Sequence, residues 1–219
     1  AYQGKLSGRL KISVVSTGKY VMPYFMSGFM KANSGVDLVM DVTNKAKVVR
    51  SLELNEVDFA LVSVLPDKLN VQGVELMPNK LIYVCNYNRE LSKSPTKKKL
   101  FEQIPLIYRE PGSATRNAME GFIEQNNFKV NKKMELTSNE AVKQAVVSGL
   151  GCSIMPLIGI KNELLNKDLK IVPVKGLAIT TTWNLIWLKS KNLSPAAVAF
   201  LNYLEEKKEE IIKNKFDWI

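Results

Sequence analysis

The segment from Pro111 to Arg116 carries the densest set of groups that could bind an anion. It reads Pro-Gly-Ser-Ala-Thr-Arg, which places two hydroxyls and a guanidinium close to a glycine that lets the backbone approach a ligand. If a helix begins here, its first N–H groups would point at the same ligand. The pattern favours a carboxylate or phosphate held by Ser113, Thr115 and Arg116. An ordinary capped helix with a solvated arginine fits the same residues.

Small polar residues also follow three short apolar runs in the first third of the chain. Ligands collect at the carboxyl ends of parallel strands, where helix N-termini present N–H groups, so these positions are candidate contacts. Each residue alone fits a helix cap or a packed hydroxyl equally well. The residues are Ser16, Thr17, Asn44 and Ser63.

Composition excludes several kinds of active site. The 219 residues contain 31 Lys and Arg, 21 Asp and Glu and no histidine, so the formal net charge is +10. Without histidine the chain cannot by itself form a Ser-His-Asp or Cys-His nucleophile system or a histidine zinc site. It also contains no glycine-rich dinucleotide fingerprint, P-loop or metal-spaced carboxylate cluster. We therefore predict a binding protein with no catalytic residue, no cofactor and no metal.

The basic excess is scattered along the chain. Its densest cluster is Lys93, Lys97, Lys98 and Lys99, and no aromatic residues are interleaved with it, as they would be in a single-strand nucleic-acid binder. We interpret the cluster as the solvated start of a short helix rather than a track for a phosphate backbone.

The two cysteines, Cys85 and Cys152, lie inside apolar runs, and we interpret them as buried free thiols in a reducing compartment rather than a disulfide. No run approaches the roughly 18 apolar residues that a membrane span requires. The first residues do not have the pattern of a signal peptide. These features predict a soluble cytoplasmic protein with no membrane partner.

Strand-like and helix-like segments alternate along the chain, which indicates an α/β fold with mostly parallel sheets. Expected strands cover residues 10–15, 36–43, 59–64, 81–86, 105–108, 133–136, 152–155, 169–174 and 181–189. Expected helices cover residues 22–33, 45–54, 95–103, 117–126 and 157–165, one that runs from the capping box 137–140 to 148, and one that begins at 195. Two strands, 81–86 and 181–189, lie where one α/β unit gives way to the next. The predicted units are therefore 1–80 with 184–219, and 81–183.

From about Gly8 to Leu204 the chain resembles the effector-binding domain of LysR-type transcriptional regulators. The residues that carry the resemblance are 8–12, 16–17 before Met22-Pro23, 55–62, 110–116 and 147–156. Within that family it looks similar to regulators of the Rubisco, or carbon-fixation, operon. This narrower likeness is carried by residues 16–20, 109–113 and 137–146.

The resemblance implies two Rossmann-like subdomains joined by two crossing strands, as in type 2 periplasmic binding proteins. It also implies an effector in the cleft between them and a homodimer or tetramer. Carbon-fixation regulators respond to phosphorylated metabolites and NADPH, so a sugar phosphate, nucleotide or carboxylate is the implied effector. The family's winged helix-turn-helix precedes this region and is absent here, so DNA contact is not expected from these 219 residues.

The family cleft maps onto a set of seven residues in this chain. Arg116 would supply the charge, and we expect its replacement by alanine to weaken effector binding by about 2 kcal/mol. The set is Ser16, Thr17, Asn44, Ser63, Ser113, Thr115 and Arg116.

Two other classes of protein share a two-lobed scaffold. A solute-binding protein of a transporter is one alternative, and an export signal upstream would favour it, whereas a helix-turn-helix would favour regulation. An enzyme such as a prephenate dehydratase is the other, because its site also uses a Thr-Arg pair at a helix start, as Thr115 and Arg116 would.

Overall fold

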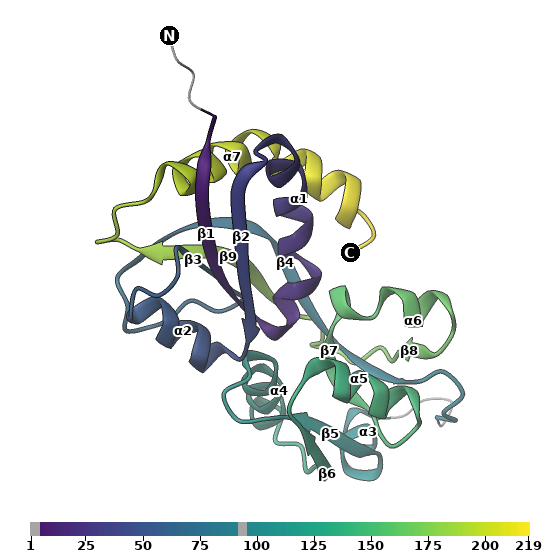
Figure 1. The fold of residues 1–219 in the computed structure, drawn as a ribbon. Coiled ribbons are helices and arrows are strands. Elements are labelled where there is room, and N and C mark those ends of the chain that lie inside the picture. Colours follow the sequence, from purple (N-terminus) through teal and green to yellow (C-terminus); the bar gives the residue numbers. More distant parts are fainter. Residues whose placement is uncertain (1–4, 92–95) are drawn as a thin grey trace. The chain divides into compact units, whose positions relative to one another are not determined.

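The computed structural model describes residues 5–91 and 96–219, whose contacts divide the chain into two units. Unit 1 is Ala1–Pro78 with Thr182–Ile219, and unit 2 is Asn79–Thr181. Strands β4 (Val71–Asn86) and β9 (Ile179–Leu188) each contain residues of both units (Figure 1). The boundaries expected from the sequence, at 80 and 183, fall in these same two strands.

The sheet of unit 1 has the strand order β2-β1-β3-β9-β4. In this sheet β1 (Ser7–Val15) runs parallel to β2 (Gly35–Thr43) on one side and to β3 (Phe59–Val62) on the other. Strand β9 returns antiparallel to β3. The predicted α/β class is therefore confirmed, and in this unit three parallel strands end at one edge.

Helices α1 (Met22–Ala32) and α7 (Pro195–Phe216) pack together through aromatic side chains. The rings of Phe29 and Phe200 lie 5.2 Å apart, and Phe200 also lies 6.0 Å from Phe59 of β3, so the helix pair is joined to the sheet. Helix α2 (Lys45–Glu53) contacts β1 and β3. The short 3-10 helix η1 (Ser16–Tyr20) connects β1 to α1.

Unit 2 repeats the strand-helix alternation with its own core. Strand β5 (Pro105–Arg109) is parallel to β6 (Asn131–Leu136), and Leu106 bridges to Cys152, just before β7 (Ser153–Pro156). The second half of β4 lies antiparallel to β7 and to β8 (Leu169–Ile171). The helices are α3 (Lys97–Gln103), α4 (Ala114–Gln125), α5 (Asn139–Val147), α6 (Lys161–Leu165) and the 3-10 helix η2 (Leu157–Gly159).

Several expected elements differ in extent from those in the structure. The strand expected at 81–86 begins ten residues earlier, at Val71. Gly73 and Pro78 mask this extension in the sequence, because both residues are disfavoured inside strands. Gly73 is required there, since a Cβ on it would lie 3.1 Å from the carbonyl oxygen of Leu185 on β9. The helix expected at 157–165 is divided into η2 and α6, and the strand expected at 169–174 ends at Ile171, before Pro173.

The prediction of two free thiols is wrong. Cys85 and Cys152 form a disulfide, with their Cα atoms 4.5 Å apart. The register of β4 and β7 explains the pairing, because Val84 lies opposite Ser153 and the next pair outward is Cys85 and Cys152. Both side chains are fully buried in the core of unit 2, beside Tyr83. Burial in apolar runs, which the sequence did show, does not distinguish a thiol from a disulfide.

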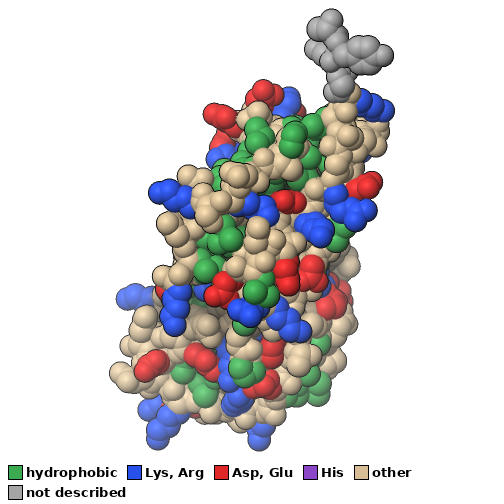
Figure 2. Space-filling model, turned by 60° about the vertical axis from the view of Figure 1, so that its left-hand side comes forward, with side chains coloured by type: hydrophobic (Ala, Val, Ile, Leu, Met, Phe, Trp, Pro, Cys, Tyr) green, Lys and Arg blue, Asp and Glu red, His purple; other side chains and the backbone are tan. Residues whose placement is uncertain are grey.

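Charged side chains of both signs are interspersed on the face of the molecule that Figure 2 shows. In the lysine cluster, Lys93 lies outside the described residues, and Lys98 is exposed in an ion pair with Glu102 on α3. Thr96 caps α3 by accepting a hydrogen bond from the N–H of Lys99. No helix within residues 5–91 and 96–219 has the length and apolar character needed to cross a membrane.

Candidate functional site

Four of the predicted contacts lie together at the carboxyl edge of the unit 1 sheet. In the parallel pairing of β1 and β2, Val15 is opposite Thr43, so Ser16 and Asn44 follow the ends of neighbouring strands. In the pairing of β1 and β3, Val14 is opposite Leu61, which places Ser63 beside Ser16 by the same register. The structure therefore brings Ser16, Thr17, Asn44 and Ser63 to one edge, where α1 and α2 begin.

Ser16 and Thr17 belong to η1, the turn between β1 and α1. Thr17 is buried and Ser16 half-buried. Gly18 permits the close approach of this turn to the sheet, because a Cβ on it would lie 2.9 Å from Cδ2 of Leu61. The turn therefore lies directly over the Leu61 side chain of β3.

Asn44 is the N-cap of α2. Its side-chain oxygen accepts a hydrogen bond of 3.0 Å from the N–H of Lys47, so this oxygen already caps the start of the helix. The side-chain amide group remains as the part of Asn44 that can donate to a ligand. Ser63 is buried, with 8% of its surface exposed.

In unit 2, Ser113 and Thr115 lie at the start of α4, directly after β5. The Ser113 hydroxyl accepts a hydrogen bond from the N–H of Arg116 at 3.4 Å, and both Ser113 and Thr115 are buried. Helix α4 begins at Ala114, three residues before the expected start at 117. Its first N–H groups lie with these two hydroxyls at one helix start, and the binding of an anion there stays a prediction.

The guanidinium of Arg116 is not available in the way the sequence suggested. It donates to Glu120 at 2.8 Å, to Glu135 at 2.6 Å and to the carbonyl oxygen of Arg109 at 3.0 Å. It also lies over the ring of Tyr108. Two carboxylates therefore compensate its charge within unit 2. The role of Arg116 in binding an anion stays a prediction, and in this structure its guanidinium is bonded within unit 2.

This network also perturbs one carboxylate. Hydrogen bonds from Arg116 and, secondarily, from Lys132 hold the pKa of Glu135 below its usual value. Lys132 lies 3.2 Å from Glu135 and also packs over the Tyr108 ring. The group thus ties β5, β6 and α4 together on a surface of unit 2.

The start of α5 is a second helix start in unit 2, and none of the seven predicted contacts lies there. Ser138 caps this helix by accepting from the N–H of Ala141 at 3.0 Å, so the cap lies one residue after Thr137, where the predicted box 137–140 would place it. Asn139, the next residue, is 1% exposed, and its side-chain nitrogen has no hydrogen-bond partner within the described part of the chain. The polar run 137–140, which predicted a helix start, could also have marked Asn139 as a candidate contact.

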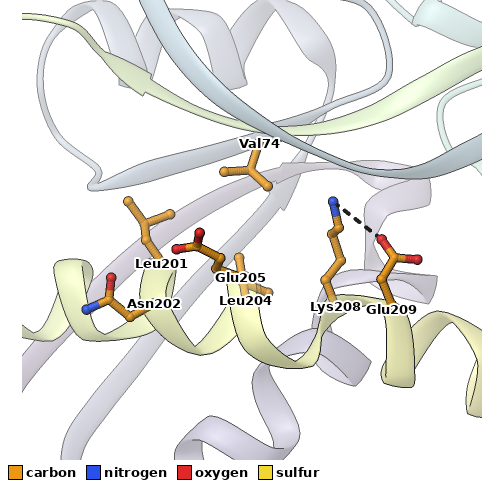
Figure 3. A pocket seen from close by; sticks show the side chains of 7 residues that line it. All are labelled: Val74, Leu201, Asn202, Leu204, Glu205, Lys208 and Glu209. Carbon is orange, nitrogen blue, oxygen red and sulfur yellow. Dashed lines mark ion pairs between the residues drawn. The ribbon is translucent and has the colours of Figure 1, made fainter.

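A hollow of about 400 Å³ lies elsewhere in unit 1, between α7 and β4. Figure 3 shows its lining residues, with Lys208 directed from α7 toward the strand that carries Val74. The Lys208 ammonium donates to the carbonyl oxygen of Glu75 and lies 3.7 Å from Glu209. None of the seven predicted contacts lines this hollow.

The described residues contain no group of three or more His, Cys, Asp or Glu side chains that could hold a metal ion.

The chain is similar to known proteins over nearly its whole length. A family described as the LysR substrate binding domain matches residues 3–209. The HTH-type transcriptional activator CmpR of Synechocystis is 35% identical over 205 residues, which are 92% of this chain and 67% of that protein. The RuBisCO operon transcriptional regulator of Allochromatium vinosum is 37% identical over 204 residues, with the same coverage. This chain therefore spans about two thirds of the length of these relatives.

Solved structures show the same fold. The regulatory domain of CcmR from Synechocystis PCC6803, in complex with 2-PG, superposes with a TM-score of 0.86 and 29% identity over 93% of this chain and 98% of that one. The effector-binding domain of QuiR in complex with shikimate gives a TM-score of 0.79 at 18% identity, over 94% of this chain and 99% of that one.

Proposed function

Because this chain belongs to the LysR substrate binding domain family, we propose that it senses a small anionic metabolite for a transcriptional regulator. The single observation that carries the anionic preference is the collection of hydroxyls and helix starts at the carboxyl ends of parallel strands. Helix N-termini favour negative charge, and the surrounding hydroxyls can donate to carboxylate or phosphoryl oxygens. The 2-PG bound by the related CcmR domain supports the same class of ligand.

We infer that both units contribute contacts to one effector, as the family resemblance implies. Unit 1 would contribute Ser16, Thr17, Asn44 and Ser63, and unit 2 would contribute Ser113 and Thr115. In this assignment Arg116 does not touch the effector but holds the start of α4 in place, because its guanidinium is paired with Glu120 and Glu135. Backbone N–H groups and hydroxyls then carry anion recognition without a full positive charge.

An effector can control transcription only if it binds one arrangement of the protein more tightly than another. We propose that the effector biases such an equilibrium between arrangements of the two units. DNA binding, assembly into a homodimer or tetramer and a cytoplasmic location are parts of the same proposal. The regulators among the relatives support them and disfavour a transport protein or a prephenate dehydratase.

A binding screen tests the proposal. Purified protein is titrated calorimetrically with 2-PG, ribulose bisphosphate, NADPH, a dicarboxylate and an uncharged sugar of similar size. We expect at least one anion to bind and to raise the melting temperature, since a ligand specific for the folded state stabilises it. Binding of the uncharged sugar alone would refute an anion sensor, and hydrolysis or dehydration of a ligand would indicate an enzyme.

Ser63→Ala and Thr17→Val are each expected to weaken binding of the best anion about tenfold, about 1.4 kcal/mol, because each removes one hydrogen bond to a charged oxygen. Calorimetry measures the change. Ser51→Ala, near the far end of α2, is the matched control and should leave the affinity unchanged. Equal affinity in all three variants would show that the effector does not bind at the carboxyl edge of unit 1.

A further inference from the structure

Trp183 carries a buried hydrogen-bond donor that the fold does not use. Its side chain is 0% exposed, and its indole Nε1 has no hydrogen-bond partner among the described residues. Buried N–H groups are nearly always bonded in native proteins, because losing water without gaining an acceptor costs free energy. The indole nitrogen only donates, so the missing partner must be an acceptor.

The register of the sheet places this indole at the carboxyl edge of unit 1. In the antiparallel pairing of β3 and β9, Leu61 is opposite Leu185 and Val62 is opposite Asn184. Continuing the register by one residue places Ser63 opposite Trp183. Residues directly opposite each other in an antiparallel pair share one face of the sheet, so Trp183 and Ser63 lie on the same face.

The turn that carries Ser16 and Thr17 covers that same face. Leu61 and Ser63 are two residues apart on the chain and therefore share a face. Gly18 of η1 lies close to the Leu61 side chain, since a Cβ on Gly18 would be 2.9 Å from its Cδ2. The turn η1 therefore lies over this face. The indole thus belongs to the same end of the sheet as the hydroxyls already proposed to bind the effector.

Trp187, four residues further along β9, gives a useful contrast. It lies on the same face and packs edge-on against Phe59 with ring centroids 5.7 Å apart. Its nitrogen is not among the buried atoms that lack a partner. Packing alone therefore accounts for Trp187 but leaves the N–H of Trp183 unexplained.

We propose that the indole N–H of Trp183 donates a hydrogen bond to a carboxylate or phosphoryl oxygen of the effector, beside Ser63. This assignment rests on the proposed function. It makes Trp183 a specificity-determining residue, because the indole N–H can donate to an oxyanion at this position but offers no acceptor to an ammonium group.

The test removes the donor and keeps an aromatic ring. Trp183→Phe and the control Trp187→Phe are titrated with 2-PG, inorganic phosphate and the best anion of the wild-type screen. We expect about a tenfold loss of affinity in Trp183→Phe and less than a twofold change in Trp187→Phe. Circular dichroism of both variants verifies that they fold.

A second measurement uses the wild-type protein and does not depend on the variant's folding. The chain has three tryptophans, so ¹⁵N-labelled protein gives three indole N–H signals, which single Trp→Phe variants assign. On saturation with the best anion, the Trp183 proton should move downfield more than those of Trp187 and Trp218.

The outcomes separate the two proposals. If no anion in the panel binds the wild type, the proposed function is refuted and this assignment with it. If an anion binds but the Trp183 signal stays in place and Trp183→Phe binds equally well, the assignment alone is refuted, and a buried water is the partner of the indole.

Discussion

Replacing both Cys85 and Cys152 by alanine should lower the free energy of unfolding by about 4 kcal/mol. The disulfide closes a loop with a sequence separation of 67, and loss of such a cross-link restores conformational entropy to the unfolded chain. The chain-entropy relation gives about 3 kcal/mol for a short loop and nearly 5 for a loop of about 100 residues. This pair falls between those limits.

The disulfide lies where its loss should weaken the packing of several strands of unit 2. Cys152 donates its N–H to the carbonyl oxygen of Pro105 and accepts from the N–H of Ile107, so it is already bonded to β5. The disulfide adds a covalent link from the same residue to β4. Cys152 therefore joins strands on both of its sides, and unit 2 should lose cooperativity as well as stability.

Equilibrium denaturation of the oxidised, reduced and double-alanine proteins measures the effect. The reduced wild type is the matched control, since it lacks the cross-link but keeps both sulfur atoms. Both cysteines are buried, so reduction has to be carried out in denaturant before refolding. A difference below about 1 kcal/mol between oxidised and reduced protein would mean that the thiols are free in solution, as the sequence alone suggested.

The pairing of Cys85 with Cys152 could not be predicted from the sequence. Each cysteine sits in an apolar run that predicts burial, and both are buried. Their pairing follows from the antiparallel register of β4 and β7, which no local pattern contains. Helix starts differ from this disulfide because they can be recognised in the sequence. Ser138 and Ser194 each accept from an N–H group only three residues further along the chain.

The same distinction applies to the candidate site. The carboxyl ends of β1, β2 and β3 could be predicted from three apolar runs and the polar residues after them, because parallel strands must end together. The unpartnered nitrogen of Trp183 could not, since a sequence shows a donor but not the absence of its acceptor. The partners of Arg116 could not be predicted either, because a sequence shows a charge without its partners. Glu120 is one turn away on the same helix, but Glu135 comes from β6.

Arg116→Ala should lower the free energy of unfolding by about 2 kcal/mol while changing the effector affinity less than threefold. The guanidinium is largely buried, with 14% of the side chain exposed, and it bonds two carboxylates and one carbonyl oxygen. Its removal leaves Glu120 and Glu135 without their cation and the carbonyl oxygen of Arg109 without this donor, and the loss of three bonds should cost more than the loss of one exposed pair. The affinity should hold because the hydroxyls of Ser113 and Thr115 remain at the start of α4.

The pH dependence identifies the carboxylate involved. Arg116 lowers the pKa of Glu135 in the folded protein below its usual value of 4.5, so this interaction stabilises the fold above that pH and is lost as the pH falls through the lowered pKa. The difference in free energy of unfolding between wild type and Arg116→Ala should therefore be largest near neutral pH and should decrease as the pH is lowered below about 4. Denaturation at a series of pH values measures this difference. Arg50→Ala, which removes an exposed pair with Glu53, is the control and should cost less than about 0.5 kcal/mol. Unchanged stability with a large loss of affinity would instead make Arg116 a direct contact of the effector.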